Sequence, residues 1–206
     1  MSKLKIAVLA SGRGSNFKAI AEAVKKGEVD AEISILITDK QDAGAIQIAK
    51  SYNILVQFID FTKYSNKEDG DLEIKKVLDS KGVGLVVLAG YMRILRSRAL
   101  LDAYKFKIIN IHPSLLPAFK GSTHAQNDAF DYGCKVSGLT IHFVTADVDG
   151  GQIIYQEAVD ISDCKTGSEA AVKILKKEHE AYKKIIDSFS KGKYEIKGNR
   201  AEFVRN

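Results

Sequence analysis

Two side chains capable of acid–base and oxyanion chemistry lie close together in the stretch Ile108–Pro117. Asn110 and His112 are two positions apart, and residues two apart in an extended strand project from the same face. Pro113 cannot donate a ladder hydrogen bond, so we expect the strand to end there. A protonated imidazole beside an amide can stabilise negative charge on a carbonyl oxygen. A histidine followed by proline can equally be structural, and the spacing alone does not decide.

A carboxylate that could act on this imidazole is Asp149, which lies in a short Asp- and Gly-containing loop between two apolar β-type runs. A nearby negative charge favours the imidazolium form and therefore raises the pKa of a histidine. The run before this loop is expected to neighbour the strand that carries Asn110 and His112. We therefore predict that the three groups meet and that Asp149 raises the pKa of His112.

A glycine-rich turn occupies Ser11–Asn16, between an apolar run and a segment with helical spacing. Such a turn exposes backbone N–H groups at the positive end of a helix dipole, which suits a phosphate. Phe17 stands where a dinucleotide fingerprint would have its third glycine. Asp39, after the next apolar run, could hold a ribose. The pattern therefore favours an anion-binding site. Two alternatives remain: a site for a nucleotide cofactor, and a tight turn with no ligand.

These residues need a sheet to position them, and the first half of the chain alternates between strand and helix patterns. Strands are expected at 6–9, 33–38, 55–60, 82–89 and 106–112, and helices at 17–26, 43–52 and 71–80. The alternation predicts an α/β fold with a doubly wound, mostly parallel sheet, helices on both faces and a Rossmann-like N-terminal half. Such sheets bind ligands at the carboxyl ends of their strands.

The pattern changes in the second half of the chain. A short helix is expected to end at Asp131, and the runs 139–145 and 152–161 predict an antiparallel addition to the sheet. Ser168 is expected to cap a long final helix. We predict one domain over 1–206, with a phosphate-binding half at about 1–105, a catalytic half at about 106–190, and a tail at 191–206.

Composition narrows the class of protein. Lys and Arg number 31 against 26 Asp and Glu, a net charge of +5 that could favour an anionic small substrate or weak contact with nucleic acid. Many of the lysines lie near the C-terminus and predict a solvated helix face. No apolar run approaches the roughly 20 residues of a membrane span. Cys134 and Cys164 have neither metal-type nor framework spacing, so we expect no metal and a cytoplasmic location.

Four motifs taken together resemble one family. They are SGRGSN at 11–16, LAGYMRIL at 88–95, NIHPSLLP at 110–117, and HFVT at 142–145 with Asp149. In this order, over about residues 4–190, they are similar to those of the phosphoribosylglycinamide formyltransferases, a folate-dependent family. The resemblance implies transfer of a formyl group from 10-formyltetrahydrofolate to the amine of 5-phosphoribosylglycinamide in purine biosynthesis.

The resemblance also implies that the catalytic half at about 106–190 is the folate-binding half, and it implies roles for individual residues. The residues that would hold the ribonucleotide phosphate are Gly14, Ser15 and Asn16. Those that would line the folate pocket, largely through backbone groups, are Met92, Arg93, Ile94 and Leu95. Asn110 would contact the formyl oxygen, His112 would act as the acid and oxyanion partner, and Asp149 would raise the His112 pKa. Lys67 stands where the family commonly has Arg, and it would contact the folate with a point charge instead of a planar fork.

Four other functions remain as alternative hypotheses. A formyltetrahydrofolate deformylase would share the Asn/His/Asp set, but it usually has an extra N-terminal domain, whereas the first strand is expected within a few residues of Met1. A methionyl-tRNA formyltransferase would need more chain after Asp163. A nicotinamide-dependent oxidoreductase would rely on Asp39, and a nucleic-acid binder on the basic C-terminal residues. We expect small-molecule substrates, no nucleic acid, no membrane, and a monomer or homodimer.

Overall fold

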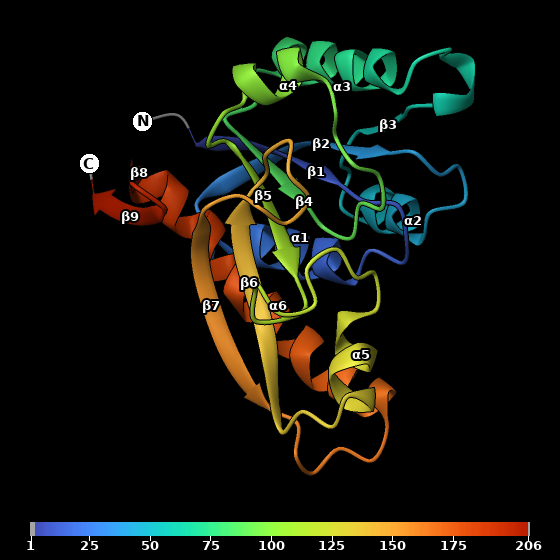
Figure 1. Cartoon of the computed structure of the whole chain (residues 1–206). Helices are drawn as coiled ribbons and strands as arrows, with labels where there is room; N and C mark the ends of the chain where they lie inside the picture. Colours follow the sequence, from blue (N-terminus) through green and yellow to red (C-terminus); the bar gives the residue numbers. More distant parts are fainter. Residues whose placement is uncertain (1–2, 206) are drawn as a thin grey trace.

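A nine-stranded sheet in the order β3-β2-β1-β4-β5-β6-β7-β9-β8 forms the centre of the fold (Figure 1). The computed structural model describes residues 3–205. The strands are β1 (Leu4–Leu9), β2 (Ala31–Thr38), β3 (Val56–Phe58), β4 (Leu85–Leu88), β5 (Ile108–His112), β6 (Val136–Phe143), β7 (Ile153–Asp160), β8 (Gly192–Lys197) and β9 (Arg200–Arg205). The first five are mutually parallel, and β6 runs antiparallel to β5 and to β7. The predicted α/β class with a mostly parallel sheet is confirmed.

Helices cover both faces of this sheet. They are α1 (Ser15–Lys26), α2 (Gly44–Ser51), the 3-10 turn η1 (Phe61–Lys63), α3 (Lys67–Lys81), α4 (Arg98–Ala103), α5 (Ala125–Asp131) and α6 (Gly167–Lys191). In Figure 1, α3 and α4 lie on one side of the sheet, and α1, α2 and α6 lie on the other. A strand covered on both faces is expected to be continuously apolar, as β1 is from Ile6 to Leu9.

Alternating residues of the central strands enter two separate hydrophobic cores. In β1, Ile6 and Val8 pack in the core beneath α1 and α6, whereas Ala7 and Leu9 pack in the core beneath α3 and α4. The same alternation in β5 sends Ile108 into the α3–α4 core. Asn110 and His112 therefore continue the α3–α4 face of the sheet, at the carboxyl end of β5.

Several helices begin at residues other than those predicted. Helix α1 ends at Lys26, as predicted, and Gly27 follows it in the left-handed conformation. Helix α3 begins at Lys67, earlier than expected, because the Asn66 side chain accepts a hydrogen bond from the Glu68 amide and caps it. The prediction that Ser168 caps α6 is wrong, since the cap is Thr166. The short helix α4 was not predicted.

The C-terminal residues form a hairpin, β8–β9, that extends the sheet beyond β7. Tyr194 packs with its ring centroid 5.0 Å from Phe189 of α6, 6.2 Å from Phe143 of β6 and 5.5 Å from Phe203 of β9. These aromatic contacts make the segment predicted as a tail, 191–206, a packed extension of the sheet over its described residues.

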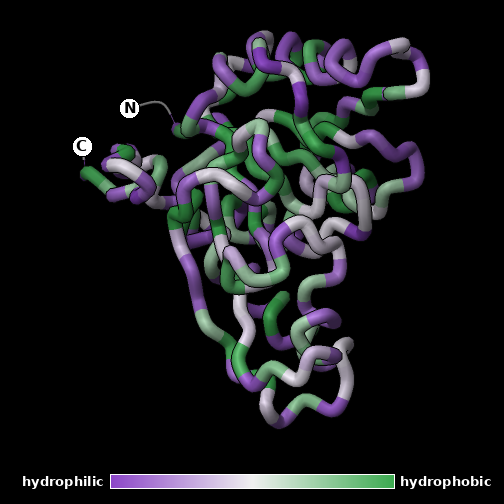
Figure 2. The backbone as a smooth tube through the Cα atoms, in the orientation of Figure 1, coloured by the Kyte–Doolittle hydropathy of each residue, from purple (hydrophilic) through white to green (hydrophobic). Residues whose placement is uncertain are grey.

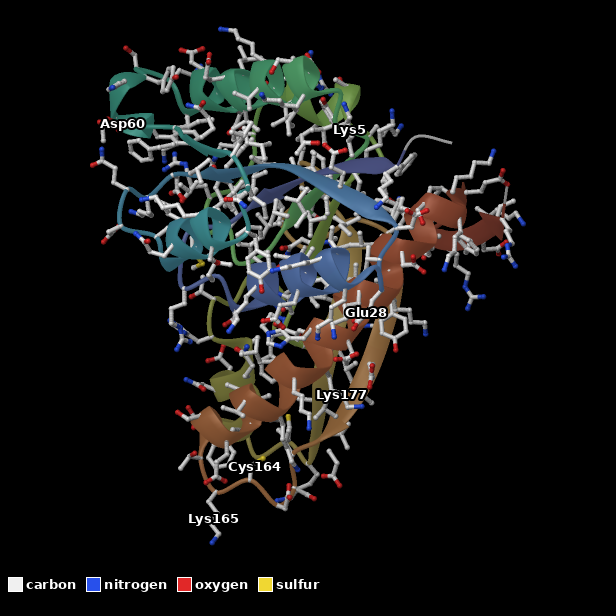
Figure 3. The ribbon with its side chains drawn as sticks, turned by 180° about the vertical axis from the view of Figure 1, so that it is seen from behind. Lys5, Glu28, Asp60, Cys164, Lys165 and Lys177 are labelled. Atoms are coloured by element: carbon white, nitrogen blue, oxygen red, sulfur yellow. The ribbon has the colours of Figure 1, made fainter. Side chains whose placement is uncertain are left out.

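Polar side chains cover the outside. Figure 2 shows apolar segments concentrated in the central strands and hydrophilic segments along α3. The predicted solvated face of α6 is seen in the view from behind, where the side chain of Lys177 is labelled (Figure 3). Lys177 Nζ lies 2.8 Å from a carboxylate oxygen of Glu157 in β7. None of the helices in the described part of the chain combines the length and apolar character that a bilayer crossing requires.

Candidate active site

A carboxylate lies between two imidazoles at the carboxyl end of β5. Asp149 Oδ2 is 3.3 Å from His112 Nδ1, and Asp149 Oδ1 is 3.4 Å from His142 Nε2. The Asn110 amide nitrogen lies 3.3 Å from the same His142 nitrogen. Asn110 and His142 are directly opposed in the antiparallel β5–β6 pair. The structure thus brings the three predicted groups together and adds a second histidine.

The loop that carries Asp149 is held in an unusual backbone conformation. Asp149 has a φ of 48°, in the left-handed region that few non-glycine residues other than Asn and Asp adopt. Gly151 has no room for a Cβ, which would overlap the carbonyl of Phe143. The Gly121 amide donates a 3.0 Å hydrogen bond to Asp149 Oδ2 from the loop after β5. The two loops therefore fix the carboxylate over the end of the strand.

The ring of His112 faces hydrogen-bond acceptors on both sides. Nδ1 faces Asp149, and Nε2 lies 3.0 Å from the carbonyl oxygen of Phe119. Only a doubly protonated ring can donate to both. Burial lowers the pKa of His112 below its ordinary value, while Asp149 and the Phe119 carbonyl act to raise it. Asp149 therefore raises the His112 pKa, as predicted, but burial lowers it by more, and the net pKa lies below its ordinary value.

Asp149 itself is held in its charged form. A hydrogen bond from His142 contributes most to lowering the pKa of this carboxyl, followed by the Gly121 amide and the charge of His112; partial burial acts in the opposite direction. A carboxylate that stays ionised can stabilise positive charge that forms on the neighbouring ring during a proton transfer.

His142 is a site residue that sequence reasoning missed. It lies in an alternating strand pattern, which is typical of a residue that packs internally, and it is 2% exposed. The missing information is the register of β6 against β5, which places it opposite Asn110. His142 Nδ1 donates to the carbonyl of Phe143 (2.9 Å), so its Nε2 faces the Asn110 amide and Asp149.

A cavity of about 390 Å³ opens beside these groups. The residues that line it are Gly90–Leu95, Asn110–Pro113, Gly121–Thr123, Val144, Thr145 and Asp147–Asp149, with Leu88, Gln126, His142, Asn16 and Glu178. The predicted folate-pocket residues Met92, Arg93, Ile94 and Leu95 all line it. Lys67 is exposed at the start of α3 and is not among the lining residues.

The far end of the cavity meets the N-terminus of α1. Gly14 precedes the helix with a φ of 79°, and a Cβ there would lie 2.9 Å from Ala45. No side chain caps this end, and its first turn holds no acidic residue. The first-turn amides of Ser15 and Asn16 therefore retain the positive end of the helix dipole for an anion. Asn16 lines the cavity, whereas Gly14 and Ser15 form the turn beside it.

A second residue missed from the sequence is Glu178, on the buried side of α6. It is 4% exposed, accepts a 2.8 Å hydrogen bond from the Asn16 amide and lines the cavity. Burial raises the pKa of Glu178, and the Asn16 bond only partly offsets this. Glu178 lies among lysines in the sequence, and only the packing of α6 on α1 shows that it points inward.

The site can be compared with known proteins. Residues 4–186 match the profile of the formyl transferase family, which spans most of the chain. The chain belongs to the formyl transferase family. Within residues 3–205, no group of three His, Cys, Asp or Glu side chains is placed to hold a metal ion.

Relatives within the family span most of this chain. The phosphoribosylglycinamide formyltransferase of Bacillus subtilis (strain 168) is 42% identical over 88% of this chain and 92% of its own length. The chain spans 19% of the trifunctional purine biosynthetic protein adenosine-3 of Gallus gallus, at 35% identity over 95% of this chain. The crystal structure of glycinamide ribonucleotide transformylase 1 from Symbiobacterium toebii superposes with a TM-score of 0.93 at 38% identity, covering 98% of this chain and 94% of that one.

Proposed function

We propose that this formyl transferase moves the formyl group of 10-formyltetrahydrofolate to the amine of 5-phosphoribosylglycinamide, a step of de novo purine biosynthesis. The names of the Bacillus subtilis and Symbiobacterium toebii relatives support this choice of reaction. The observation that carries it is the position of Asn110, His112 and Asp149, between an anion-binding helix end and a cavity with an apolar rim.

The donor would bind in the cavity. Its volume falls within the range of about 300–1,000 Å³ that is typical of small-molecule sites. Met92 and Ile94 are exposed apolar side chains at its rim, and Leu88 and Val144 add apolar surface. When bound, the donor supplies the formyl group. Lys67, outside the lining residues, remains a predicted contact for an anionic part of the folate.

The ribonucleotide would bind across the other end. Gly14, Ser15 and Asn16 form an uncapped helix terminus suited to a dianionic phosphate. Glu178 lies between this terminus and the reaction centre, where its carboxyl can hydrogen-bond to hydroxyl groups of a sugar. The amine of the substrate would then reach the formyl carbon close to His112.

The side chains at β5 would assist the exchange of one C–N bond for another. Asn110 donates a hydrogen bond to the formyl oxygen, where negative charge develops as the amine attacks. His112 stabilises the same charge through Nε2 and moves the proton lost by the amine to the departing folate nitrogen. Asp149 keeps the ring oriented and stabilises its charged form. In the structure His112 Nε2 is within hydrogen-bond distance of the Phe119 carbonyl oxygen, and the substrate would take the place of that carbonyl.

Further expectations follow from the same proposal. The substrates are small molecules, and nucleic acid and membrane play no part. Cys134 and Cys164 are free thiols, which fits the predicted cytoplasmic location. A monomer or a homodimer remains the predicted assembly.

The direct test is a product assay with purified protein, 10-formyltetrahydrofolate and phosphoribosylglycinamide. The proposal predicts formylated ribonucleotide in proportion to the tetrahydrofolate released, and little formate. Release of formate at the same rate with and without the ribonucleotide would identify a deformylase and overturn the proposal. His112→Ala should lower the rate of transfer by about 100- to 1,000-fold while ribonucleotide binding, measured by calorimetry, stays nearly intact.

A further inference from the structure

One wall of the cavity, Gly90–Leu95, has neither helical nor strand structure and continues so to Ser97. Within residues 3–205, the backbone groups of residues 91–96 make no hydrogen bond to other backbone groups. A segment with so few internal bonds is held only by what side chains provide. It also leaves the backbone groups of Arg93, Ile94 and Leu95 free to bind a ligand.

Side chains anchor this wall at both ends. At one end, Ser11 Oγ accepts a 2.9 Å hydrogen bond from the Met92 amide and donates a 2.6 Å bond to Asp39. At the other end, Asp71 Oδ2 accepts from two consecutive amides, those of Arg96 (2.6 Å) and Ser97 (2.9 Å). Hydrogen bonds to a charged acceptor are about twice as strong as neutral ones.

Asp71 is buried, and it belongs to a different element from the wall it holds. It lies in the second turn of α3 and is 1% exposed. Burial is the largest influence and raises the pKa of Asp71 above its ordinary value; the two amides and the charge of Arg93 lower it only in part, and the charge of Glu68 adds to the rise. The Arg93 guanidinium also lies 3.6 Å from the ring centroid of Phe61, which packs against Gly70, the neighbour of Asp71 in α3. Helix α3 thus fixes both the middle and the end of the wall.

We propose that Asp71 is a positioning residue for the formyl donor, because it fixes the free backbone groups of Arg93–Leu95 where the flat ring of the folate would meet them. Asp71 does not line the cavity and acts through the Arg96 and Ser97 amides. This inference rests on the proposed function. A purely structural alternative exists, since the Ser97 amide precedes α4 and its satisfaction could serve that helix alone.

The test separates the two roles by steady-state kinetics. Asp71→Ala should raise the KM for 10-formyltetrahydrofolate about 10- to 100-fold, because the competent wall conformation becomes a minor one. The KM for phosphoribosylglycinamide, and kcat at saturating donor, should stay near their wild-type values. Asp71→Asn retains an oxygen acceptor and should show a smaller rise. Amide hydrogen exchange of residues 91–97 should be faster in Asp71→Ala than in the wild type.

Asp79→Ala is the matched control on the same helix. Asp79 accepts hydrogen bonds from Tyr104 (2.9 Å) and Lys75 (2.6 Å) and ties α3 to the end of α4 without contact with the wall. It should lower the unfolding temperature and leave the donor KM unchanged. If Asp71→Ala also lowers the unfolding temperature and leaves the donor KM and the exchange of residues 91–97 unchanged, the proposal is overturned.

Two further measurements keep the test decisive. If Asp71→Ala does not fold, Asp71→Asn replaces it. A raised donor KM with faster amide exchange in that variant supports the proposal, and wild-type values of both overturn it.

Binding of tetrahydrofolate alone, measured by thermal shift, is independent of turnover. If the wild type forms no formylated ribonucleotide, the proposed function fails. Weaker tetrahydrofolate binding by the variant would still support the positioning role, and equal binding would overturn it.

Discussion

Replacement of Glu178 by Gln should stabilise the protein at neutral pH. Within residues 3–205 no cation faces the Glu178 carboxyl, and its hydrogen bond is to the neutral amide of Asn16. Burial raises the pKa of Glu178 above its ordinary value of 4.5. Gln has nearly the same shape and can accept the same bond from Asn16. It therefore keeps the packing and removes the cost of a buried, unpaired charge.

The size and sign of this effect follow from proton linkage. Above pH 4.5 the unfolded chain has lost the Glu178 proton, whereas the folded chain still holds it. The contribution of Glu178 to the wild-type unfolding free energy therefore falls as pH rises, by up to about 1.4 kcal/mol per pH unit, until the folded pKa is reached. Below pH 4.5 the wild type and Glu178→Gln should be nearly equal in stability. The advantage of the variant should then grow with pH.

Urea denaturation of both proteins at pH 4.5, 6 and 7.5 measures the difference. Glu180→Gln is the control, because Glu180 is an exposed neighbour on the same helix, paired with Lys183 at 3.0 Å. This change removes the same charge without a buried site, and its effect should vary little with pH. A Glu178→Gln variant whose stability relative to wild type is flat with pH, or falls as pH rises, would refute the reasoning.

Three other predictions concern the site and the fold. Asp149→Asn should lower kcat by about 100- to 1,000-fold. It should also move the acid limb of the pH–rate profile to lower pH, because the Asp149 charge raises the His112 pKa against burial; an unmoved limb would contradict this. Gly70→Ala should displace Phe61, destabilise the protein by about 1–3 kcal/mol in urea denaturation and raise the donor KM. Thr166→Ala should cost about 1 kcal/mol of stability as a lost helix cap, with kcat unchanged.

The centre of the fold could be predicted because local chemistry and global position agree there. Strand β4 is a continuous apolar run because both of its faces are covered. Gly27 ends α1 because it can adopt the left-handed conformation. Asn110 and His112 are two positions apart, and side chains two apart in a strand project from the same face of the sheet. Their spacing therefore predicts that they lie on one face. Each of these conclusions needs only neighbouring residues.

The remainder depends on register and burial, which local sequence does not encode. His142 joins the site because one particular pairing of β6 with β5 places it opposite Asn110. Glu178 and Asp71 sit in polar helices, and only the packing of those helices shows that both carboxyls point inward. The net His112 pKa is likewise a balance between burial and Asp149 that requires coordinates.

The sequence predicts that helix α6 exists but does not identify its capping residue. Thr166 and Ser168 are both good caps and lie two residues apart, so sequence preference alone could not choose between them. The final hairpin was predicted only as a tail, because its stability comes from aromatic contacts of Tyr194 with β6 and α6, which lie far from it or outside it in the sequence.

The central claim is that His112, oriented by Asp149 and accompanied by Asn110, stabilises charge and moves the proton during formyl transfer. The most direct measurement is the single-turnover rate of formyl transfer by His112→Ala with both substrates saturating. The rate should fall by about 100- to 1,000-fold, while the dissociation constant for phosphoribosylglycinamide changes little. A His112→Ala variant that transfers the formyl group at the wild-type single-turnover rate would contradict the account.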